Sequence, residues 1–385
     1  MDIAERVACV LPSPPRAIFD LAAQYDDVID LTLGDPDLPP PLNVREAACR
    51  AIMAGKTRYS ANAGLIQLRR AIAEDTRRRL GLAVSPEKEV IVTVGAMEAS
   101  FLTLYTLLSP GDEAVIHAPY WINYAQVVRS LGATPVFVNT RPEENFVLQA
   151  KDLEAVLTPR TKLVVLNSPN NPSGAIIPKA TLERIAALAR ERNFIVLSDE
   201  IYDALIYDGV PHASIWSLEG MRERTVMING LSKRFAMTGW RLGWAIAPEN
   251  VVAQMTKMQE NIVACAPLPA QHAAIEALSE ATDMTYIRDE FQRRRDVIVE
   301  GIAQIPRLKC MPVPATFYAL IDVGATGLDG KEFAFKLLEK EHVAVVYGAA
   351  YGGDAYSRFI RIAFTMAVEK LKAALERIAN FVNSL

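Results

Sequence analysis

Between about Arg45 and Val263, short apolar runs rich in β-branched residues alternate with segments of helical periodicity. We predict seven strands in this region: Glu89–Val94, Ala114–His117, Thr134–Val138, Leu163–Leu166, Phe194–Leu197, Thr225–Ile228 and Leu242–Ile246. Helical patterns separate most of them, notably Glu98–Leu108, Trp121–Leu131 and Lys179–Arg192. Apolar strands joined by helical crossovers indicate a mostly parallel sheet that is covered on both faces. The chain is therefore expected to have an α/β fold.

After Pro248 the pattern changes to long helices and fewer strands. We predict helices over Asn250–Ile262, Pro269–Ser279, Asp283–Ile305, Lys331–Lys340 and from about Ala367, and strands over Phe317–Ile321, Ala344–Val346 and Phe359–Ala363. A chain of 385 residues has room for about two to three domains. We expect a large domain over residues 45–285 and a smaller α+β domain from residues 1–44 together with 286–385.

Composition excludes several classes of function. The net charge is −4 with both signs mixed along the chain, so nucleic acid is not an expected partner. No apolar run approaches the roughly 20 residues that span a bilayer, and residues 1–19 lack the pattern of a signal peptide, so a cytoplasmic protein is expected. Four dispersed cysteines are interpreted as free thiols, mostly in the core, and four dispersed histidines show no metal-ligand spacing.

The segment from Asn229 to Arg241 dominates the functional interpretation. A strand ends at Asn229, a glycine follows, and Lys233 is expected in a loop beyond that strand end. Ligands of open parallel sheets bind beyond the carboxyl ends of the strands. A lone lysine is usually a solvated surface residue, so the interpretation depends on what surrounds Lys233.

Three other strand ends carry polar or glycine-rich sequences. Asp199 follows the strand at Phe194–Leu197, although an aspartate there can also cap a helix. Asn171 lies in Asn167–Gly174, which is also rich in ordinary turn formers. Gly95 lies where a strand turns into a helix, a join that offers backbone N–H groups to a phosphate but is common in α/β folds.

These residues suit pyridoxal 5′-phosphate (PLP). PLP acts as an electron sink only while its ring nitrogen is protonated, and a buried carboxylate beside that nitrogen keeps it so. Asp199 is the candidate carboxylate. Tyr202, three residues later, could reach the ring hydroxyl, and the Asn171 amide could bond the ring oxygen.

Taken together, the chain resembles the PLP-dependent class I aminotransferases of fold type I, in the branch that holds the bacterial aspartate, aromatic and alanine enzymes. The resemblance runs in order through Gly34–Asp37, Tyr59–Gly64, Leu68-Arg69, Gly95–Met97, Pro119–Trp121, Asn170–Pro172, Asp199–Tyr202, Ser232-Lys233, Arg241 and Arg361. It implies a mostly parallel seven-stranded sheet in the large domain, a PLP cofactor, and ping-pong transfer of an amino group.

The resemblance also implies roles for individual residues. Lys233 would form a Schiff base with PLP and then move the proton in catalysis, with Asp199 on the ring nitrogen and Tyr202 on the ring oxygen. The remaining cofactor contacts would come from Gly95, Ala96, Met97, Trp121, Asn171, Ser232 and Arg241. Tyr59 would reach the phosphate of the neighbouring subunit in a homodimer.

For the substrate, the resemblance implies that Arg361 pairs with the α-carboxylate, beside Trp121 and Asn171. The planar guanidinium matches a carboxylate in a way that lysine cannot. Gly34 would lie against the substrate, where a side chain would intrude.

Several positions depart from the family pattern, and they bear on the substrate. Aspartate-specific members often carry a lysine where this chain has Met97, which favours a neutral or aromatic amino acid as donor. Met97 could instead only pack beneath the loop. Other departures are Pro12–Pro15, Leu38, Ala315-Thr316 and Tyr347. The expected acceptor is 2-oxoglutarate, and aspartate stays as a second candidate donor.

Three other functions compete with this interpretation. A PLP carbon–sulfur β-lyase on the same fold would use the same lysine, aspartate and arginines. A ligand-sensing regulator would need an N-terminal DNA-binding module, for which the first 30 residues are too short. A nicotinamide dehydrogenase is disfavoured because no G-x-G-x-x-G follows an early strand.

Overall fold

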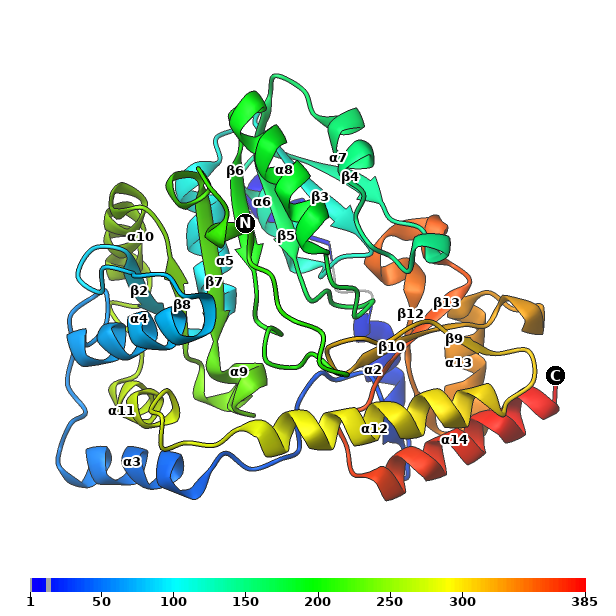
Figure 1. Ribbon diagram of the computed structural model, residues 1–385. Coiled ribbons are helices and arrows are strands. Elements are labelled where there is room, and N and C mark those ends of the chain that lie inside the picture. The colour runs from blue at the N-terminus through cyan, green and yellow to red at the C-terminus, as the bar shows by residue number, and fades with distance from the viewer. Residues whose placement is uncertain (1, 12–14) are drawn as a thin grey trace.

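The computed structural model describes residues 2–11 and 15–385, and its elements group around two sheets (Figure 1). Most of the departure at Pro12–Pro15 lies outside the described residues. No helix among the described residues combines the length and apolar character needed to cross a bilayer.

The larger sheet has seven strands in the order β2-β8-β7-β6-β5-β3-β4. Their bounds are β2 (Val90–Thr93), β3 (Glu113–Ala118), β4 (Thr134–Asn139), β5 (Thr161–Asn167), β6 (Ile195–Asp199), β7 (Thr225–Gly230) and β8 (Gly243–Ile246). All seven predicted strands are present, with each end within two residues of the prediction. Only β8 runs antiparallel to its neighbours β2 and β7, so the prediction of a mostly parallel sheet is confirmed.

Helices cover both faces of this sheet, because its strands are apolar on both sides. One face packs against α5 (Gly95–Leu107), α6 (Asn123–Ser130) and α10 (Glu249–Ile262). The other packs against α7 (Ala150–Val156) and α8 (Lys179–Arg192), and near β2 against α4 (Ile66–Leu80). Helix α11 (Leu268–Ala277) packs on α4, and α3 (Leu42–Met53) packs on α11. Figure 1 shows the strands between these helices.

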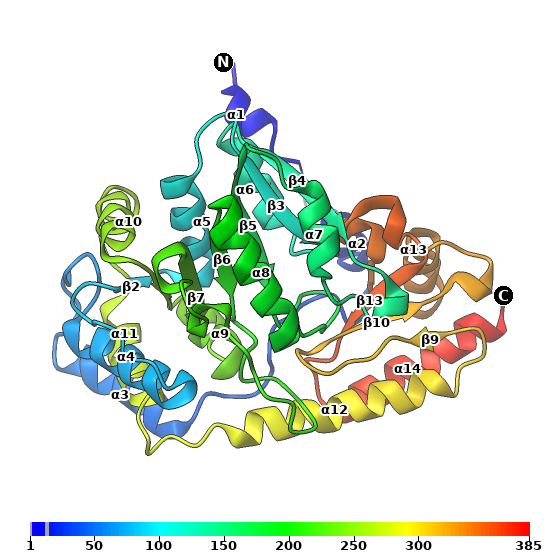
Figure 2. The ribbon, with the colours of Figure 1, turned by 45° about the horizontal axis from the view of Figure 1, so that its top comes forward.

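The second lobe holds the antiparallel sheet β12-β13-β10-β9. It comprises β9 (Lys309–Cys310), β10 (Tyr318–Asp322), β12 (Val346–Tyr347) and β13 (Phe359–Ala363), with α12 (Thr285–Ala303), α13 (Gly330–Glu341) and α14 (Val368–Asn383). Helices α12 and α14 lie side by side along one edge of the molecule (Figures 1 and 2). The single strand predicted over Ala344–Val346 is wrong, because β11 (Val343–Ala344) pairs with β1 (Ile29–Asp30) whereas β12 pairs with β13.

The N-terminal segment divides between the two lobes. Helix α2 (Pro15–Ala22) and β1 contact elements of the second lobe. Helix α1 (Glu5–Ala8) instead packs near α6 beside the large sheet (Figure 2), where Leu11 N donates to Gln126 Oε1 at 3.1 Å. The domain limits at 44/45 and 285/286 stay a prediction.

The cysteines are free, as expected, but they are not core residues. Cys49 is exposed, and Cys9, Cys265 and Cys310 are only partly buried. The prediction that they lie mostly in the core is wrong: Cys49 lies within α3 but is exposed, and the other three are only partly buried.

Candidate active site

The carboxyl ends of β5, β6 and β7 lie together, because the three strands are neighbouring and parallel. Beyond them is a cavity of about 180 Å³. Its lining comprises Ala96, Met97, Trp121, Tyr124, Asn167, Asn171, Asp199, Ile201, Tyr202, Ser232, Lys233, Thr238, Arg241 and Tyr318. Residues predicted separately at several strand ends therefore share one cavity, where parallel sheets usually bind ligands.

Lys233 lies in α9 (Leu231–Arg234), a single helical turn, and not in the predicted loop. The turn closes because Phe235 N donates to Leu231 O at 3.1 Å. The Lys233 Nζ donates to the Gly34 carbonyl at 2.7 Å and lies 5.4 Å from the centre of the Phe317 ring. Burial, together with the nearby Arg241 and Arg361, lowers the pKa of Lys233 to about 8. A lysine with such a pKa is partly neutral near pH 7 and can accept a proton.

Asp199 is the last residue of β6, and its carboxylate is buried. The Tyr124 hydroxyl donates to Oδ2, and the backbone N–H of Ile201 donates to Oδ1 at 3.1 Å. Burial raises the pKa of Asp199 to about 6, although both hydrogen bonds act to lower it. The group is thus mostly ionised at neutral pH and suited to pairing with a cationic ring nitrogen.

Tyr124 is a site residue that the sequence analysis missed. It lies in α6, is almost fully buried, and packs edge-on against Trp121 with the ring centres 5.1 Å apart. Burial raises the pKa of Tyr124 well above its usual value, so its hydroxyl stays a donor. Its only signal in the sequence is its place three residues after Trp121.

Arg361, from β13 in the second lobe, contacts two residues that line the cavity, Asn171 and Tyr318. Its Nη1 donates to Asn171 Oδ1 at 3.1 Å and its Nη2 donates to the Thr32 carbonyl. The guanidinium lies between the rings of Tyr318 and Tyr351, at 4.3 and 4.9 Å from their centres. Its buried Nε has no partner, so the fork retains a donor for an incoming acceptor.

Tyr202 lines the same cavity, and its hydroxyl donates to the Tyr318 hydroxyl at 3.3 Å. Burial raises the pKa of Tyr202 well above its usual value, so the phenol is neutral at working pH. Tyr318 falls within the strand predicted over Phe317–Ile321, but its contacts with Tyr202 and Arg361 were not predicted from the sequence.

Gly95 opens α5 with a φ of +77°, a conformation that favours glycine. A Cβ on Gly95 would lie 2.6 Å from Arg241 Nη2, and one on Gly243 would lie 2.4 Å from Ala96 N. The backbone and the guanidinium therefore form a tight cradle at a helix N-terminus, which fits a phosphate. Arg241 is exposed and donates to the Thr238 carbonyl at 2.8 Å, while Met97 at the rim is 47% exposed.

Four predicted site residues do not themselves line the cavity: Gly34, Tyr59, Gly95 and Arg361. Gly95 lies against the lining residue Arg241, and Arg361 bonds the lining residue Asn171. Gly34 still belongs to the site, because its carbonyl accepts from Lys233 and an added Cβ would lie 1.7 Å from the Tyr318 hydroxyl oxygen. Tyr59 does not reach the cavity of its own protomer. It is 86% exposed and lies in a separate hollow with Arg58 and Cys265.

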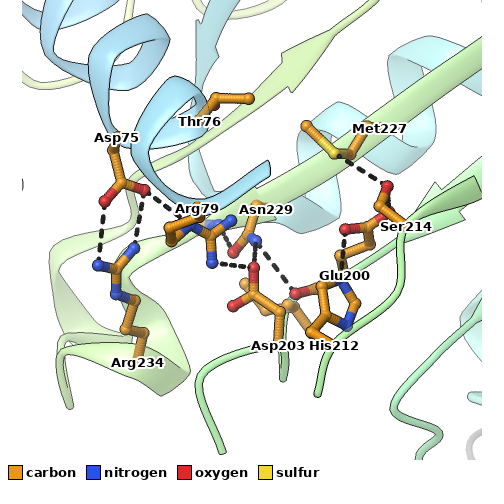
Figure 3. Close-up of polar contacts among 12 residues, drawn as sticks. Asp75, Thr76, Arg79, Glu200, Asp203, His212, Ser214, Met227, Asn229 and Arg234 are labelled. Atoms are coloured by element: carbon orange, nitrogen blue, oxygen red, sulfur yellow. Dashed lines mark hydrogen bonds and ion pairs between the residues drawn. The ribbon is translucent and has the colours of Figure 1, made fainter. Parts of the chain in front are cut away.

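The histidines show no metal-ligand spacing in the sequence, but the fold brings His212 close to two carboxylates. Among the described residues, Glu200, Asp203 and His212 bring their ligand atoms within 4.8 Å of one another. Their partners are arginine, serine and asparagine side chains (Figure 3). Burial alone would lower the pKa of His212, but Glu200 raises it above its ordinary value, which disfavours a metal because metals bind neutral imidazole.

Comparison with known proteins agrees with this geometry. The family model for "Aminotransferase class I and II" matches residues 26–378. The aspartate/prephenate aminotransferase of Thermus thermophilus is 40% identical over 385 residues, covering 98% of each chain. Aromatic-amino-acid aminotransferase 2 of Thermococcus litoralis is 38% identical over 381 residues, covering 98% of this chain and 97% of that one. The solved structure of the T. thermophilus aspartate aminotransferase with maleate superposes with a TM-score of 0.93, at 40% identity and 99% coverage of both chains.

Proposed function

The chain belongs to the class I and II aminotransferases, and we propose that it transfers the amino group of a neutral or aromatic L-amino acid to a 2-oxo acid. As a member of this family it is a PLP-dependent transaminase with the fold-type I architecture. The observation that carries the site assignment is that Lys233 and Asp199 line one cavity, with the Gly95–Arg241 cradle at its edge.

These residues fit PLP in this chain. The cradle has no space for a Cβ at Gly95, as expected where a backbone closes on a phosphate. We assign Gly95, Ala96, Met97, Ser232 and Arg241 to the phosphate end. At the ring, Asp199 would hold the nitrogen cationic, Tyr202 and Asn171 would bond the ring oxygen, and Trp121 would stack on the face. The cofactor supplies an electron sink for the carbanion formed at the substrate α-carbon.

Lys233 is the residue we assign to proton transfer. Its lowered pKa leaves a fraction of the amine neutral near pH 7 and able to take the α-proton. The Gly34 carbonyl, 2.7 Å from Nζ, orients the amine within the cavity. Arg361 would bind the α-carboxylate through the N–H edge of its guanidinium, where Nε has no partner, while the flanking rings of Tyr318 and Tyr351 hold its plane.

The donor class follows from the charges that line the cavity. Among the described lining residues, the cations are Lys233 and Arg241, both of which the assignment already uses. Met97 occupies the rim with an adaptable apolar side chain. A donor with a second carboxylate therefore finds no further cation among the described residues that line the cavity. 2-Oxoglutarate also carries a second carboxylate, so the acceptor is tested separately from the donor.

Single-turnover spectra with separate donors test this assignment. The visible absorbance of the holoenzyme should change faster with phenylalanine, methionine or alanine than with aspartate, and it should be absent in Lys233→Ala. Acceptors are then ranked with 2-oxoglutarate and pyruvate. Aspartate reacting far faster than the neutral donors would overturn the donor class. Pyruvate and ammonia released from cystathionine, with no 2-oxo acid added, would indicate the β-lyase instead.

We further propose that the enzyme is a cytoplasmic homodimer in which Tyr59 serves the neighbouring site. Large apolar side chains are exposed near this region, including Ile52, Met53 and Leu42, and such patches usually mark interfaces. Sedimentation velocity measures the oligomeric state, and Tyr59→Phe should weaken cofactor binding without changing that state. A monomer at micromolar concentration, or unchanged cofactor affinity, contradicts the respective part of this proposal.

A further inference from the structure

The residues that directly follow Asp199 and Lys233 both belong to one buried charged network. Glu200 follows the carboxylate at the end of β6, and Arg234 follows the lysine in α9. Both side chains join a network on the side of the sheet edge that faces helix α4 (Figure 3). Lys233 and Asp199 are thus each directly followed in the chain by a charged residue of the network.

Arg79, on α4, connects the two parts of the network. Its Nε lies 3.1 Å from Asp75 Oδ2, and its Nη1 donates to Asp203 Oδ2. Asp75 in turn holds Arg234 with two parallel bonds, of 2.8 and 3.0 Å. Arg79 therefore ties the lysine turn, through Asp75, to Asp203 four residues after Asp199.

Asn229, the penultimate residue of β7, bridges the two strand ends. Its Nδ2 donates to Asp203 Oδ2 at 2.6 Å and to the Glu200 carbonyl at 3.1 Å, and its Oδ1 accepts from Gly230 N at 2.7 Å. The Glu200 carboxylate is fixed separately, by His212 at 2.7 Å and Ser214 at 2.5 Å. Apart from the Arg79–Asp75 pair within α4 and the Asn229–Gly230 bond within β7, each link joins a residue within a few positions of Asp199 or Lys233 to another element.

The network is buried and its charges are paired. The side chains of Asp75, Glu200 and Asp203 are 3%, 2% and 0% exposed, so none can rely on water for compensation. Burial alone would raise the pKa of Asp203, but Arg79, His212 and Arg234 together lower it. Removal of one partner from a buried pair leaves an uncompensated charge, so the position of each member is strongly constrained.

We propose that this network, centred on Arg79, is a positioning device that fixes the Lys233 turn relative to the Asp199 carboxylate. None of its four central residues lines the active-site cavity, so Arg79, Asp75, Asp203 and Asn229 are positioning residues. The inference rests on the proposed roles of Lys233 and Asp199. Its consequence is that damage to the network misaligns the amine and the carboxylate across the cavity, and misplacement by about 1 Å can cost about 100-fold in rate.

The test compares Arg79→Met with Arg77→Met in the holoenzyme. Arg77 lies on the same helix, but it is 59% exposed and pairs with the exposed Glu74. Four quantities are measured for each variant: the melting temperature, kcat, the donor KM, and the pH midpoint of the visible absorbance. We expect Arg79→Met to lower kcat by up to about 100-fold with little change in donor KM. Its absorbance midpoint should shift by about one pH unit, whereas Arg77→Met should match the wild type.

Two further variants keep the test decisive if Arg79→Met does not fold. Arg79→Lys retains the charge, but its ammonium cannot span two carboxylates, so it should show a smaller loss of kcat in the same direction. Asn229→Ala removes the bridge between strand ends and leaves every ion pair intact, so it should shift the absorbance midpoint and lower kcat with a modest change in melting temperature.

A lower melting temperature with unchanged kcat and absorbance midpoint in the folded variants would mean that the network only stabilises the fold, and the inference would be overturned. This outcome differs from failure of the proposed function. In that case the wild type itself would show no visible band that depends on Lys233, whatever the Arg79 variants did.

Discussion

The hydrogen bond from Tyr124 to Asp199 allows a quantitative prediction. Tyr124→Phe deletes one hydroxyl from a buried site and leaves the ring contact with Trp121 in place. Asp199 Oδ2 then loses its donor, while Oδ1 keeps the bond from Ile201 N at 3.1 Å. The perturbation is therefore confined to the support of one carboxylate oxygen.

The size of the effect follows from the charge of the acceptor. A hydrogen bond to an ionised group contributes about 1.5–3 kcal/mol, and one pKa unit corresponds to about 1.4 kcal/mol. Because the bond favours the ionised carboxylate, its loss should raise the pKa of Asp199 from about 6 to about 7–8. At pH 7 the ionised fraction would fall from about nine-tenths to between about one-half and one-tenth.

Cofactor affinity measured against pH provides the assay. Asp199 pairs with the cationic ring only when ionised, so its contribution to binding should be lost as the pH falls through the pKa of Asp199. In the wild type the loss should centre near pH 6, and in Tyr124→Phe it should move up by about one to two units. The ionisations of free PLP are common to both proteins and cancel in the comparison.

Tyr105→Phe is the matched control, because Tyr105 lies on the neighbouring helix α5 and is 44% exposed. This control should keep the wild-type midpoint. If Tyr124→Phe also kept it, while folding normally, the argument that Tyr124 sets the ionisation of Asp199 would be refuted.

Three further substitutions address the substrate side of the cavity. Arg361→Lys should lower kcat/KM for the donor by roughly 10- to 100-fold, because the bidentate contact with a carboxylate is lost. Steady-state kinetics measure this change, and a kcat/KM equal to that of the wild type would contradict the role assigned to Arg361. Gly34→Ala should lower the free energy of unfolding by about 1–3 kcal/mol and reduce kcat, since the added Cβ would overlap Tyr318. Urea unfolding and activity assays measure these two quantities, and wild-type values of both would contradict the close contact between Gly34 and Tyr318. Met97→Lys should improve aspartate relative to phenylalanine by roughly tenfold through a new rim charge, and unchanged ratios of kcat/KM would speak against Met97 as a determinant.

The large sheet was predictable because each of its strands is a continuous apolar run that carries its own signal. β5 and β6 are buried on both faces, so their buried positions form a continuous apolar run that can be recognised in the sequence. The strands of the second lobe were harder to predict from the sequence. Val343–Ala344 and Val346–Tyr347 form one apolar run, yet their partners lie in β1 and β13, and no local pattern encodes that choice.

The same distinction separates the predicted site residues from those that were missed. Asp199 and Lys233 follow strand ends, and a parallel sheet collects such ends at one edge. Tyr124 enters from a helix, so its contact depends on how α6 packs. Arg79 and Asp203 are 124 residues apart, and only tertiary structure brings them together.

Asp199 is thus influenced from two sides, and the two influences should be separable. On the cavity side Tyr124 lowers the pKa of Asp199, while on the other side the charges of Glu200 and Asp203 raise it. Arg79 partly offsets those charges through its pairing with Asp203. Removal of Tyr124's hydroxyl or of Arg79's charge should therefore move the Asp199 midpoint in the same upward direction.

Because Tyr124 contacts Asp199 and Arg79 contacts Asp203, the two substitutions act through different partners. Effects at sites without shared partners usually add. The double variant Tyr124→Phe/Arg79→Met should accordingly shift the midpoint of cofactor affinity by the sum of the two single shifts. A double shift no larger than that of one single variant would mean that both substitutions act through one rearrangement of the β6 end, and the two influences on Asp199 would not be independent.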